Sequence, residues 1–193
     1  MSALPKRKYI SPEDYLAIER ESLERHEYFD GEIFQMAGAS LSHITITGNV
    51  TTELNLRLKK RDCRVLATDM RVHIPKTGLY TYPDVSVVCG KPELLPDGHL
   101  DTLTNPILII EILSSSTEGY DKGAKFDNYR SLESLREYLL VSQDARKVMR
   151  YTKQTDGSWV LMDFIGDKTE IELVSIECQL TMEDIYDKVD LEQ

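Results

Sequence analysis

Apolar and polar positions near the start of the chain follow first a helical spacing and then the pattern of a hairpin. Ser11 and Pro12 are typical of a helix N-terminus and predict a helix over 11–22. Two short apolar and aromatic runs then meet at Asp30-Gly31, a dipeptide that tolerates the positive φ values of a tight turn. A β-hairpin is therefore predicted over 25–36.

The next apolar positions recur at steps of three and four residues, so they share one face of a helix. This helix is predicted within 41–61, although β-branched residues near its start lower its helix propensity. The repeating positions are His43, Thr47, Val50, Leu54 and Leu58.

The middle and end of the chain are rich in short runs of branched and aromatic residues, which predict strands. The run 107–113 is almost continuously aliphatic, as in a central strand that is covered on both faces. Helices at the ends and strands between them predict an α/β or α+β fold, with a mixed β-sheet flanked by helices. Further predicted elements are strands at 63–75 and 82–89 around the turn 76–78, an amphipathic segment at 117–134, strands at 136–142, 146–152 and 158–166, and a short capped helix at 181–189.

Length and charge restrict the class of protein. A chain of 193 residues suits one core, and we expect a single domain over 1–193, with an N-terminal arm and helix at 1–24 and a core at 25–193. The longest apolar stretch is far shorter than the ~20 residues that span a bilayer, so no membrane partner and a cytoplasmic location are expected. The net charge of −10 repels polyanions on average, so nucleic acid would need a local basic patch or a metal ion.

The three cysteines, Cys63, Cys89 and Cys178, do not form the close pairs that bind zinc. Cysteine is among the residues most often buried, so buried free thiols are expected at these positions.

Two acidic residues lie where the pattern predicts buried strands. Asp84 opens the apolar run 85–89, and Glu111 lies inside the run 107–113. Ionised acids are seldom buried unless they are paired or bind a metal. If the two strands are neighbours, the carboxylates can converge on Mg²⁺ or Mn²⁺, the cations that phosphodiester hydrolysis needs. The alternative is that each acid accepts a backbone hydrogen bond or pairs with a lysine at the sheet edge.

Four motifs, "PDVSVV", "IIEILSSST", "DKGAKFDNYR" and "LREYLLV", follow one another in this order from Pro83 onward. Their order and spacing resemble the Uma-two family of restriction endonuclease-like proteins, which belongs to the PD-(D/E)XK nuclease superfamily. The likeness covers most of the chain from "HEYFDGEIFQMAG" onward. It implies a restriction endonuclease-like core in which one acid opens a strand, a second lies on the next strand and a lysine completes the site.

The resemblance implies catalytic roles for Asp84, Glu111, Lys125 and His43. The superfamily lysine would fall at Leu113, so a lysine of the following helix is expected to substitute. Lys125 is the best match because Asp121, Lys125 and Tyr129 share one helical face, and Lys122 is the reserve. An ordinary surface ion pair between Asp121 and Lys125 is the alternative.

The same resemblance implies metal binding by Asp84 and Glu111, with Glu27 completing the shell, and places His43 in the same cleft. An exposed Glu27 and a packed or solvated His43 are the alternatives. Lys125 would either orient and deprotonate a water molecule or stay charged and stabilise the transition state.

The expected activity is therefore metal-dependent hydrolysis of nucleic acid, DNA rather than RNA, with a homodimer as the expected assembly. A catalytically silent binding or structural module and a phosphohydrolase acting on small phosphate esters are the alternatives. A basic cluster at the end of the predicted helix is expected to contact phosphates. The alternative is that it is a solvated helix end whose cations complement the helix dipole. That cluster comprises Arg57, Lys59, Lys60, Arg61 and Arg64, and Lys6, Arg7 and Lys8 add a second group.

Overall fold

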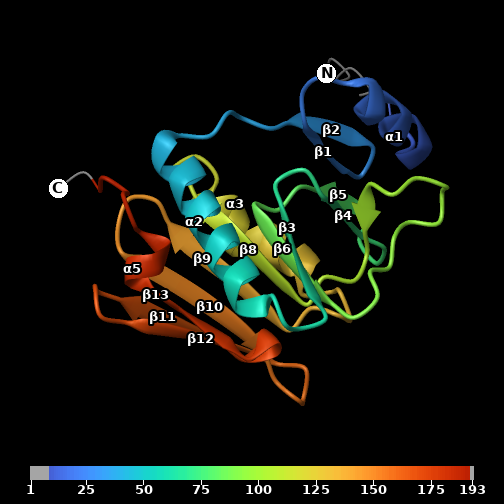
Figure 1. The fold of residues 1–193 in the computed structure, drawn as a ribbon. Helices are drawn as coiled ribbons and strands as arrows, with labels where there is room; N and C mark the ends of the chain where they lie inside the picture. Colours follow the sequence, from blue (N-terminus) through green and yellow to red (C-terminus); the bar gives the residue numbers. More distant parts are fainter. Residues whose placement is uncertain (1–8, 192–193) are drawn as a thin grey trace.

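A six-stranded mixed sheet forms the centre of the protein in the computed structural model, which describes residues 9–191 (Figure 1). The pair β8–β9 is parallel and the other neighbouring strands in this sheet are antiparallel. In spatial order the strands are β11 (Trp159–Ile165), β10 (Lys147–Lys153), β9 (Glu137–Ser142), β8 (Leu108–Leu113), β6 (Val85–Cys89) and β3 (Cys63–Ala67).

A five-stranded sheet and a two-stranded sheet complete the β structure. The first contains β2 (Glu32–Gln35), β1 (His26–Phe29), β5 (Leu79–Thr81), β4 (Arg71–Ile74) and β7 (Thr102–Leu103) in this order, and the second pairs β12 (Glu170–Leu173) with β13 (Cys178–Thr181). The helices are α1 (Pro12–Glu21), α2 (Leu41–Leu58), α3 (Glu118–Tyr120), the π-helical turn η1 (Asp121–Lys125), α4 (Phe126–Tyr129), the 3₁₀ turn η2 (Val174–Ile176) and α5 (Met182–Ile185).

Mixed sheets flanked by helices confirm the predicted fold class. None of the helices within residues 9–191 combines the length and apolar composition needed to cross a membrane.

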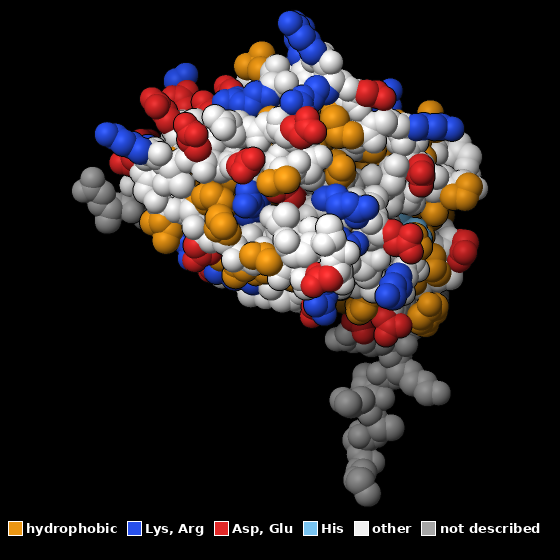
Figure 2. All heavy atoms as spheres, turned by 90° about the horizontal axis from the view of Figure 1, so that it is seen from below, with side chains coloured by type: hydrophobic (Ala, Val, Ile, Leu, Met, Phe, Trp, Pro, Cys, Tyr) orange, Lys and Arg blue, Asp and Glu red, His pale blue; other side chains and the backbone are white. Residues whose placement is uncertain are grey.

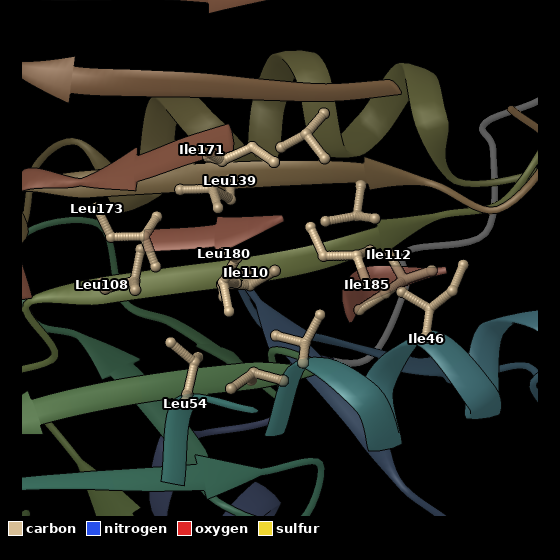
Figure 3. Close-up of a cluster of buried hydrophobic side chains, with 14 of the residues drawn as sticks. Ile46, Leu54, Leu108, Ile110, Ile112, Leu139, Ile171, Leu173, Leu180 and Ile185 are labelled. Atoms are coloured by element: carbon tan, nitrogen blue, oxygen red, sulfur yellow. The ribbon is translucent and has the colours of Figure 1, made fainter. Parts of the chain in front are cut away.

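The two faces of β8 belong to different cores. Ile110 and Ile112 pack with α2 and the small β12–β13 sheet in one cluster of buried residues (Figure 3). Ile109 and Leu113 belong to a second cluster, which includes Tyr129 from α4. Because side chains alternate along a strand, Glu111 lies on the same side as this second cluster, facing the helical segment 118–129.

Local signals place several element boundaries where the sequence predicts them. The Ser11 side chain caps α1 by accepting a hydrogen bond from the backbone N–H of Asp14 at 3.1 Å. The hairpin turns at Asp30 and Gly31, whose φ values are 47° and 81°. Thr47, Val50, Leu54 and Leu58 form the buried face of α2, and Thr181 and Asp184 form a capping box at α5. These predictions are confirmed.

The prediction of two strands at 63–75 and 82–89 is wrong in detail, because the first region is broken into β3 and β4 and the strand of the second begins only at Val85. Thr68 adopts a positive φ of 41° between β3 and β4, and its N–H donates to the carbonyl oxygen of Asp84 at 2.9 Å. Residue Asp84 therefore lies in a bend just before β6. The strands β12 and β13 were not predicted, although alternation of polar and apolar residues over Glu170–Leu173 is the signal for the first of them.

The expectation of free thiols is wrong for two of the three cysteines. Cys63 and Cys89 lie opposite each other in the β3–β6 pair and form a disulfide, whereas Cys178 is free and half-buried. The register that brings the pair together is a tertiary feature, so the spacing of the cysteines in the sequence did not reveal it.

Two glycines in contrasting backbone conformations give a test of this fold. Gly31→Ala should destabilise the protein by about 1–2 kcal/mol, because an L-residue is strained at φ 81°. Gly48 lies inside α2 with open space where a Cβ would project, so Gly48→Ala should stabilise it by roughly 0.5–1 kcal/mol. Urea unfolding measures both changes, and equal effects of the two substitutions would contradict the assigned backbone.

Candidate active site

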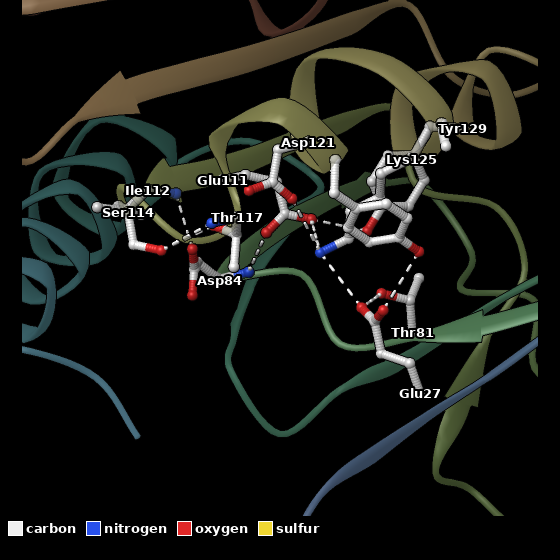
Figure 4. Close-up of polar contacts among 12 residues, drawn as sticks. Glu27, Thr81, Asp84, Glu111, Ile112, Ser114, Thr117, Asp121, Lys125 and Tyr129 are labelled. Atoms are coloured by element: carbon white, nitrogen blue, oxygen red, sulfur yellow. Dashed lines mark hydrogen bonds and ion pairs between the residues drawn. The ribbon is translucent and has the colours of Figure 1, made fainter. Parts of the chain in front are cut away.

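The two acids singled out by the sequence lie together at the junction of β6 and β8. Val85 pairs with Ile110 in the antiparallel register, so the next step places Asp84 opposite Glu111. The backbone N–H of Asp84 points to Glu111 Oε2 at 3.4 Å (Figure 4). The structure therefore brings the two carboxylates to the same side of neighbouring strands.

Two contacts hold the side chain of Asp84 in place. Its Oδ2 accepts a hydrogen bond from the backbone N–H of Ile112 at 2.7 Å, which fixes it against β8. Its Oδ1 lies 2.8 Å from His43 Nε2, on the first turn of α2. The structure thus places His43 in the same cleft as the two acids, where it orients Asp84.

The ammonium group of Lys125 lies between acidic side chains from three elements (Figure 4). Its Nζ is 3.0 Å from Glu111 Oε1, 3.3 Å from Glu27 Oε1 and 3.5 Å from Asp121 Oδ1. Glu111 Oε1 also accepts a hydrogen bond from the Tyr129 hydroxyl at 2.8 Å. Glu111, Asp121 and Lys125 are all buried, so water contributes little to neutralising this group of charges.

The helical segment 118–129 delivers the lysine through its π-helical turn η1. The Tyr138 hydroxyl donates to the carbonyl oxygen of Asp121 at 3.0 Å and ties the start of this turn to β9. Single π-helical turns are frequent at functional sites. Lys125 and Asp121 are 6% and 3% exposed, so they do not form an ordinary surface pair. Lys122, the reserve candidate, instead forms a surface ion pair with Glu118.

Glu27 reaches the site from β1 of the N-terminal hairpin. Its Oε1 accepts a hydrogen bond from Thr81 Oγ1, and its Oε2 accepts one from the Tyr120 hydroxyl at 3.3 Å. Glu27 is thus not an exposed strand residue. Its partners are Thr81, Tyr120 and Lys125 rather than Asp84. Its position on the far side of Lys125 from Glu111 makes it an anchor for the ammonium group.

A further acid, buried in the core, fixes the hairpin that carries Glu27. Glu19 of α1 accepts hydrogen bonds at 3.0 Å from the backbone N–H of His26 and from the Tyr82 hydroxyl. Tyr82 precedes Asp84 by two residues. The contact therefore ties α1 and β1 to the segment that leads into β6, which sets the distance between Glu27 and the two strand acids.

Burial and the charges of neighbouring side chains shift several pKa values in this group. Burial, opposed by Lys125 and reinforced by Asp84 and Asp121, raises the pKa of Glu111 to about 8. Burial also raises the pKa of Asp121. Burial alone would lower the pKa of Lys125, but the charges of Glu111 and its other neighbours outweigh it and hold this pKa well above the ordinary value. All three shifts favour binding of a proton, as expected of a group with surplus negative charge.

The chemistry of these donors suits a hard divalent cation that keeps much of its water. Within residues 9–191, no three His, Cys, Asp or Glu side chains form a ready-made metal cluster. Mg²⁺ is usually bound by one or two carboxylates together with water and substrate phosphate, and the pair Asp84 and Glu111 would fit that pattern. A cation there would offset the negative charges of Asp84 and Asp121, which add to the effect of burial on the pKa of Glu111.

These side chains border a pocket of about 1130 Å³. Its walls come from the hairpin, the segment 36–40, one side of α2 and the start of the helical segment after β8. Asp84, Glu111 and Lys125 all contribute to its lining, so a substrate that enters the pocket can reach them.

The predicted nucleic-acid-binding cluster lies elsewhere. Residues 57–61 are at the C-terminal end of α2, about 20 Å along the helix from His43, and none of them lines the pocket. Arg57 pairs with Glu53 and with Asp184, and Arg61 pairs with Glu177. Figure 2 shows basic and acidic side chains interspersed over the face of the molecule that is seen from below. Lys59 and Lys60 are exposed, whereas Lys6, Arg7 and Lys8 lie outside the described residues.

Two residues of the site were not found by sequence reasoning. Thr81 and Tyr120 both donate to Glu27, and neither belongs to a pattern of acids or lysines that would single it out. Their contacts depend on how the hairpin is docked against β5 and the helical segment, which no local signal encodes.

The model of the family Uma2, described as "Putative restriction endonuclease", matches residues 12–183. Two proteins of Synechocystis sp. (strain ATCC 27184 / PCC 6803 / Kazusa) are similar. "Uncharacterized protein sll1609" is 37% identical over 172 residues, which cover 89% of this chain and 97% of that protein. "Uncharacterized protein slr1290" is 38% identical over 179 residues, which cover 92% and 91%.

Among solved structures, the chain is similar to the crystal structure of "a putative nuclease belonging to DUF820" from Anabaena variabilis ATCC 29413. The TM-score is 0.72 at 20% sequence identity, over 90% of this chain and 96% of that one. The likeness confirms the predicted restriction endonuclease-like fold.

Lys125→Met tests whether the ammonium group holds the site together. The substitution should destabilise the protein by about 3–5 kcal/mol above pH 8, where Glu111 is ionised as well, because it leaves Glu111, Asp121 and Glu27 without their cation. The loss should shrink at lower pH, where the carboxylates become protonated. Lys122→Met, which removes an exposed pair with Glu118, should change stability by less than about 0.5 kcal/mol. Urea unfolding at several pH values compares them, and equal effects would contradict the role of Lys125.

Proposed function

Because the chain belongs to the Uma2 family, described as "Putative restriction endonuclease", we propose that it is a divalent-metal-dependent endonuclease that hydrolyses phosphodiester bonds. The observation that carries the proposal is the convergence of Asp84 and Glu111 from neighbouring strands beside the buried ammonium group of Lys125. Mg²⁺ or Mn²⁺ is the proposed cofactor, because both ions prefer oxygen ligands.

In this proposal Asp84 and Glu111 hold the cation. When bound, it supplies polarisation of the phosphate and activation of a water molecule for attack. His43 orients Asp84 through the 2.8 Å contact, and the backbone N–H of Ile112 fixes the second oxygen of the same carboxylate. Glu27 as a further metal ligand stays a prediction, and its contact with Lys125 supports a positioning role.

Of the two roles considered for Lys125, the charged one has more support. Its acidic neighbours hold its pKa well above the ordinary value, so the side chain keeps its proton near neutral pH. A protonated lysine stabilises the negative charge that builds up on phosphate oxygens in the transition state. We therefore assign Lys125 to charge stabilisation rather than to removal of a proton from water.

Several finer points stay predictions. They are DNA rather than RNA as substrate, a homodimer, a single domain over 1–193 with the core at 25–193, and phosphate contacts by Arg57, Lys59, Lys60 and Arg61. A cytoplasmic location is also a prediction, and the disulfide between Cys63 and Cys89 is unusual for a reducing compartment.

Asp84→Asn and Glu111→Gln test the proposed chemistry. Each should lower Mn²⁺-dependent cleavage of nucleic acid by at least about 100-fold, because loss of residues that merely support metal ligands already costs 10- to 100-fold. Asp127→Asn removes an exposed acid that pairs with Arg130 and should leave the rate unchanged. Cleavage is measured on labelled oligonucleotides and supercoiled plasmid, with circular dichroism as the folding control.

Other outcomes of that assay separate the alternatives. Folded wild-type protein that binds no Mn²⁺ and cleaves nothing would contradict the proposal and support a silent binding module. Turnover of small phosphate esters without cleavage of nucleic acid would support a phosphohydrolase.

The raised pKa of Glu111 predicts how metal affinity depends on pH. Its carboxyl group is protonated below about pH 8, and a cation must displace that proton. Affinity for Mn²⁺ should therefore rise by about tenfold per pH unit up to pH 8 and then level off. Isothermal titration calorimetry between pH 6.5 and 8.5 measures it, and Glu111→Gln should bind more weakly without this slope. An affinity of the wild-type protein that stays constant between pH 6.5 and 8 would contradict the assignment.

A further inference from the structure

Resting on the proposed nuclease function, we infer that the pocket accepts a single-stranded segment of nucleic acid and stacks one of its bases on Phe34. Three features of the pocket carry the inference: the charge of its lining, the position of Phe34 and the kind of polar group along its walls.

The lining is acidic and offers little to a polyanion. Six acidic side chains line the pocket, against the two basic side chains Arg25 and Lys125. Lys125 is buried among carboxylates, and Arg25 pairs with Asp69 at 3.2 Å. Neither is free to neutralise a row of phosphates. The acids other than Asp69 are Glu24, Glu27, Asp84, Glu111 and Asp121.

A duplex is poorly suited to such walls. It carries one negative charge per ~1.7 Å of axis, and proteins that bind it neutralise several phosphates at once with lysine and arginine. A single strand carries half that charge per unit length and can turn its bases toward the protein instead. Proteins that bind single strands commonly use aromatic side chains as stacking platforms for these bases.

Phe34 is placed as such a platform next to the candidate catalytic residues. It lies directly opposite Glu27 in the β1–β2 pair, so the two side chains project from the same face of the hairpin. Phe34 lines the pocket and is 47% exposed, although a large apolar side chain gains by burial. Tyr120, which is 39% exposed and donates to Glu27 from the other side, offers a second aromatic ring.

The remaining walls are uncharged, and apolar side chains such as Met36 and Ile44 lie there beside polar ones. The polar groups are the hydroxyl of Ser40, which donates to Gln143 Oε1 at 2.6 Å, and the amides of Gln143 and Gln35, of which Gln35 donates to Glu24 at 2.5 Å and both keep a further amide hydrogen. Such groups can hydrogen-bond the edges of unpaired bases, which a duplex hides in its base pairs. The lining thus offers apolar surface and a few amide groups to bases, and only the scissile phosphate is left for the proposed cation.

Binding and cleavage assays with one sequence in two forms test the inference. A fluorescein-labelled 20-nucleotide single strand and the corresponding 20-base-pair duplex are compared by anisotropy and by Mn²⁺-dependent cleavage. The single strand should bind and be cleaved at least about tenfold better. Phe34→Ala should weaken the affinity for the single strand about tenfold, and Phe34→Tyr should restore the affinity. Phe29→Ala is the matched control, because Phe29 is 40% exposed in the same hairpin but does not line the pocket.

The outcomes separate this inference from the proposed function. Cleavage of the duplex as fast as the single strand, with no effect of Phe34→Ala, would overturn the inference and leave the nuclease proposal standing. Binding of the single strand that depends on Phe34, without any cleavage, would support the inference on binding and contradict the nuclease proposal. Binding of a mononucleotide as tight as that of the strand would overturn the inference in favour of a small phosphate ester.

Discussion

The candidate site depends on one buried ammonium group that is outnumbered by the carboxylates around it. Lys125 contacts Glu111, Asp121 and Glu27, and each of these acids comes from a different element. Bringing these elements together without the lysine would bury repelling charges, so the ion pairs are a condition for the fold as well as a feature of the site. One positive charge does not neutralise three negative ones. The surplus is available to a proton or to a cation, which links the packing of the core to the proposed chemistry.

The geometry around this group is enforced by contacts that join distant parts of the chain. Asp84 is held by a backbone N–H of β8 and by His43 of α2, so it keeps its position only if the helix and both strands are in place. Glu27 depends in turn on Glu19, whose carboxylate bridges the hairpin and Tyr82. Catalytic groups need positions fixed to fractions of an ångström, and supporting hydrogen bonds of this kind provide them.

The sequence predicted those features that have a local cause. The cap at Ser11 and the turn at Asp30-Gly31 follow from side-chain and backbone preferences within a few residues, and both were found. Lys125 was preferred to Lys122 from helical spacing and the family likeness, and the structure buries the first and exposes the second. The disulfide and the β12–β13 pair were missed. The disulfide depends on strand register, which is set by packing over the whole chain.

A comparison of two buried acids shows why burial alone does not identify a functional site. Glu137 lies in β9, the strand that pairs with β8, and both Glu137 and Glu111 are buried acids in otherwise apolar strands. Glu137 accepts hydrogen bonds from the backbone N–H groups of Val174 and Ser175 and pairs with Arg150 at 3.9 Å, so its own donors and cation satisfy its charge away from the pocket. Glu111 instead borders the pocket and shares one ammonium group with other acids. The sequence pattern treats the two residues alike. Glu111 differs because the negative charge around it is only partly neutralised by Lys125 and because it lines a pocket that a ligand can enter. Both properties arise only when the chain is folded.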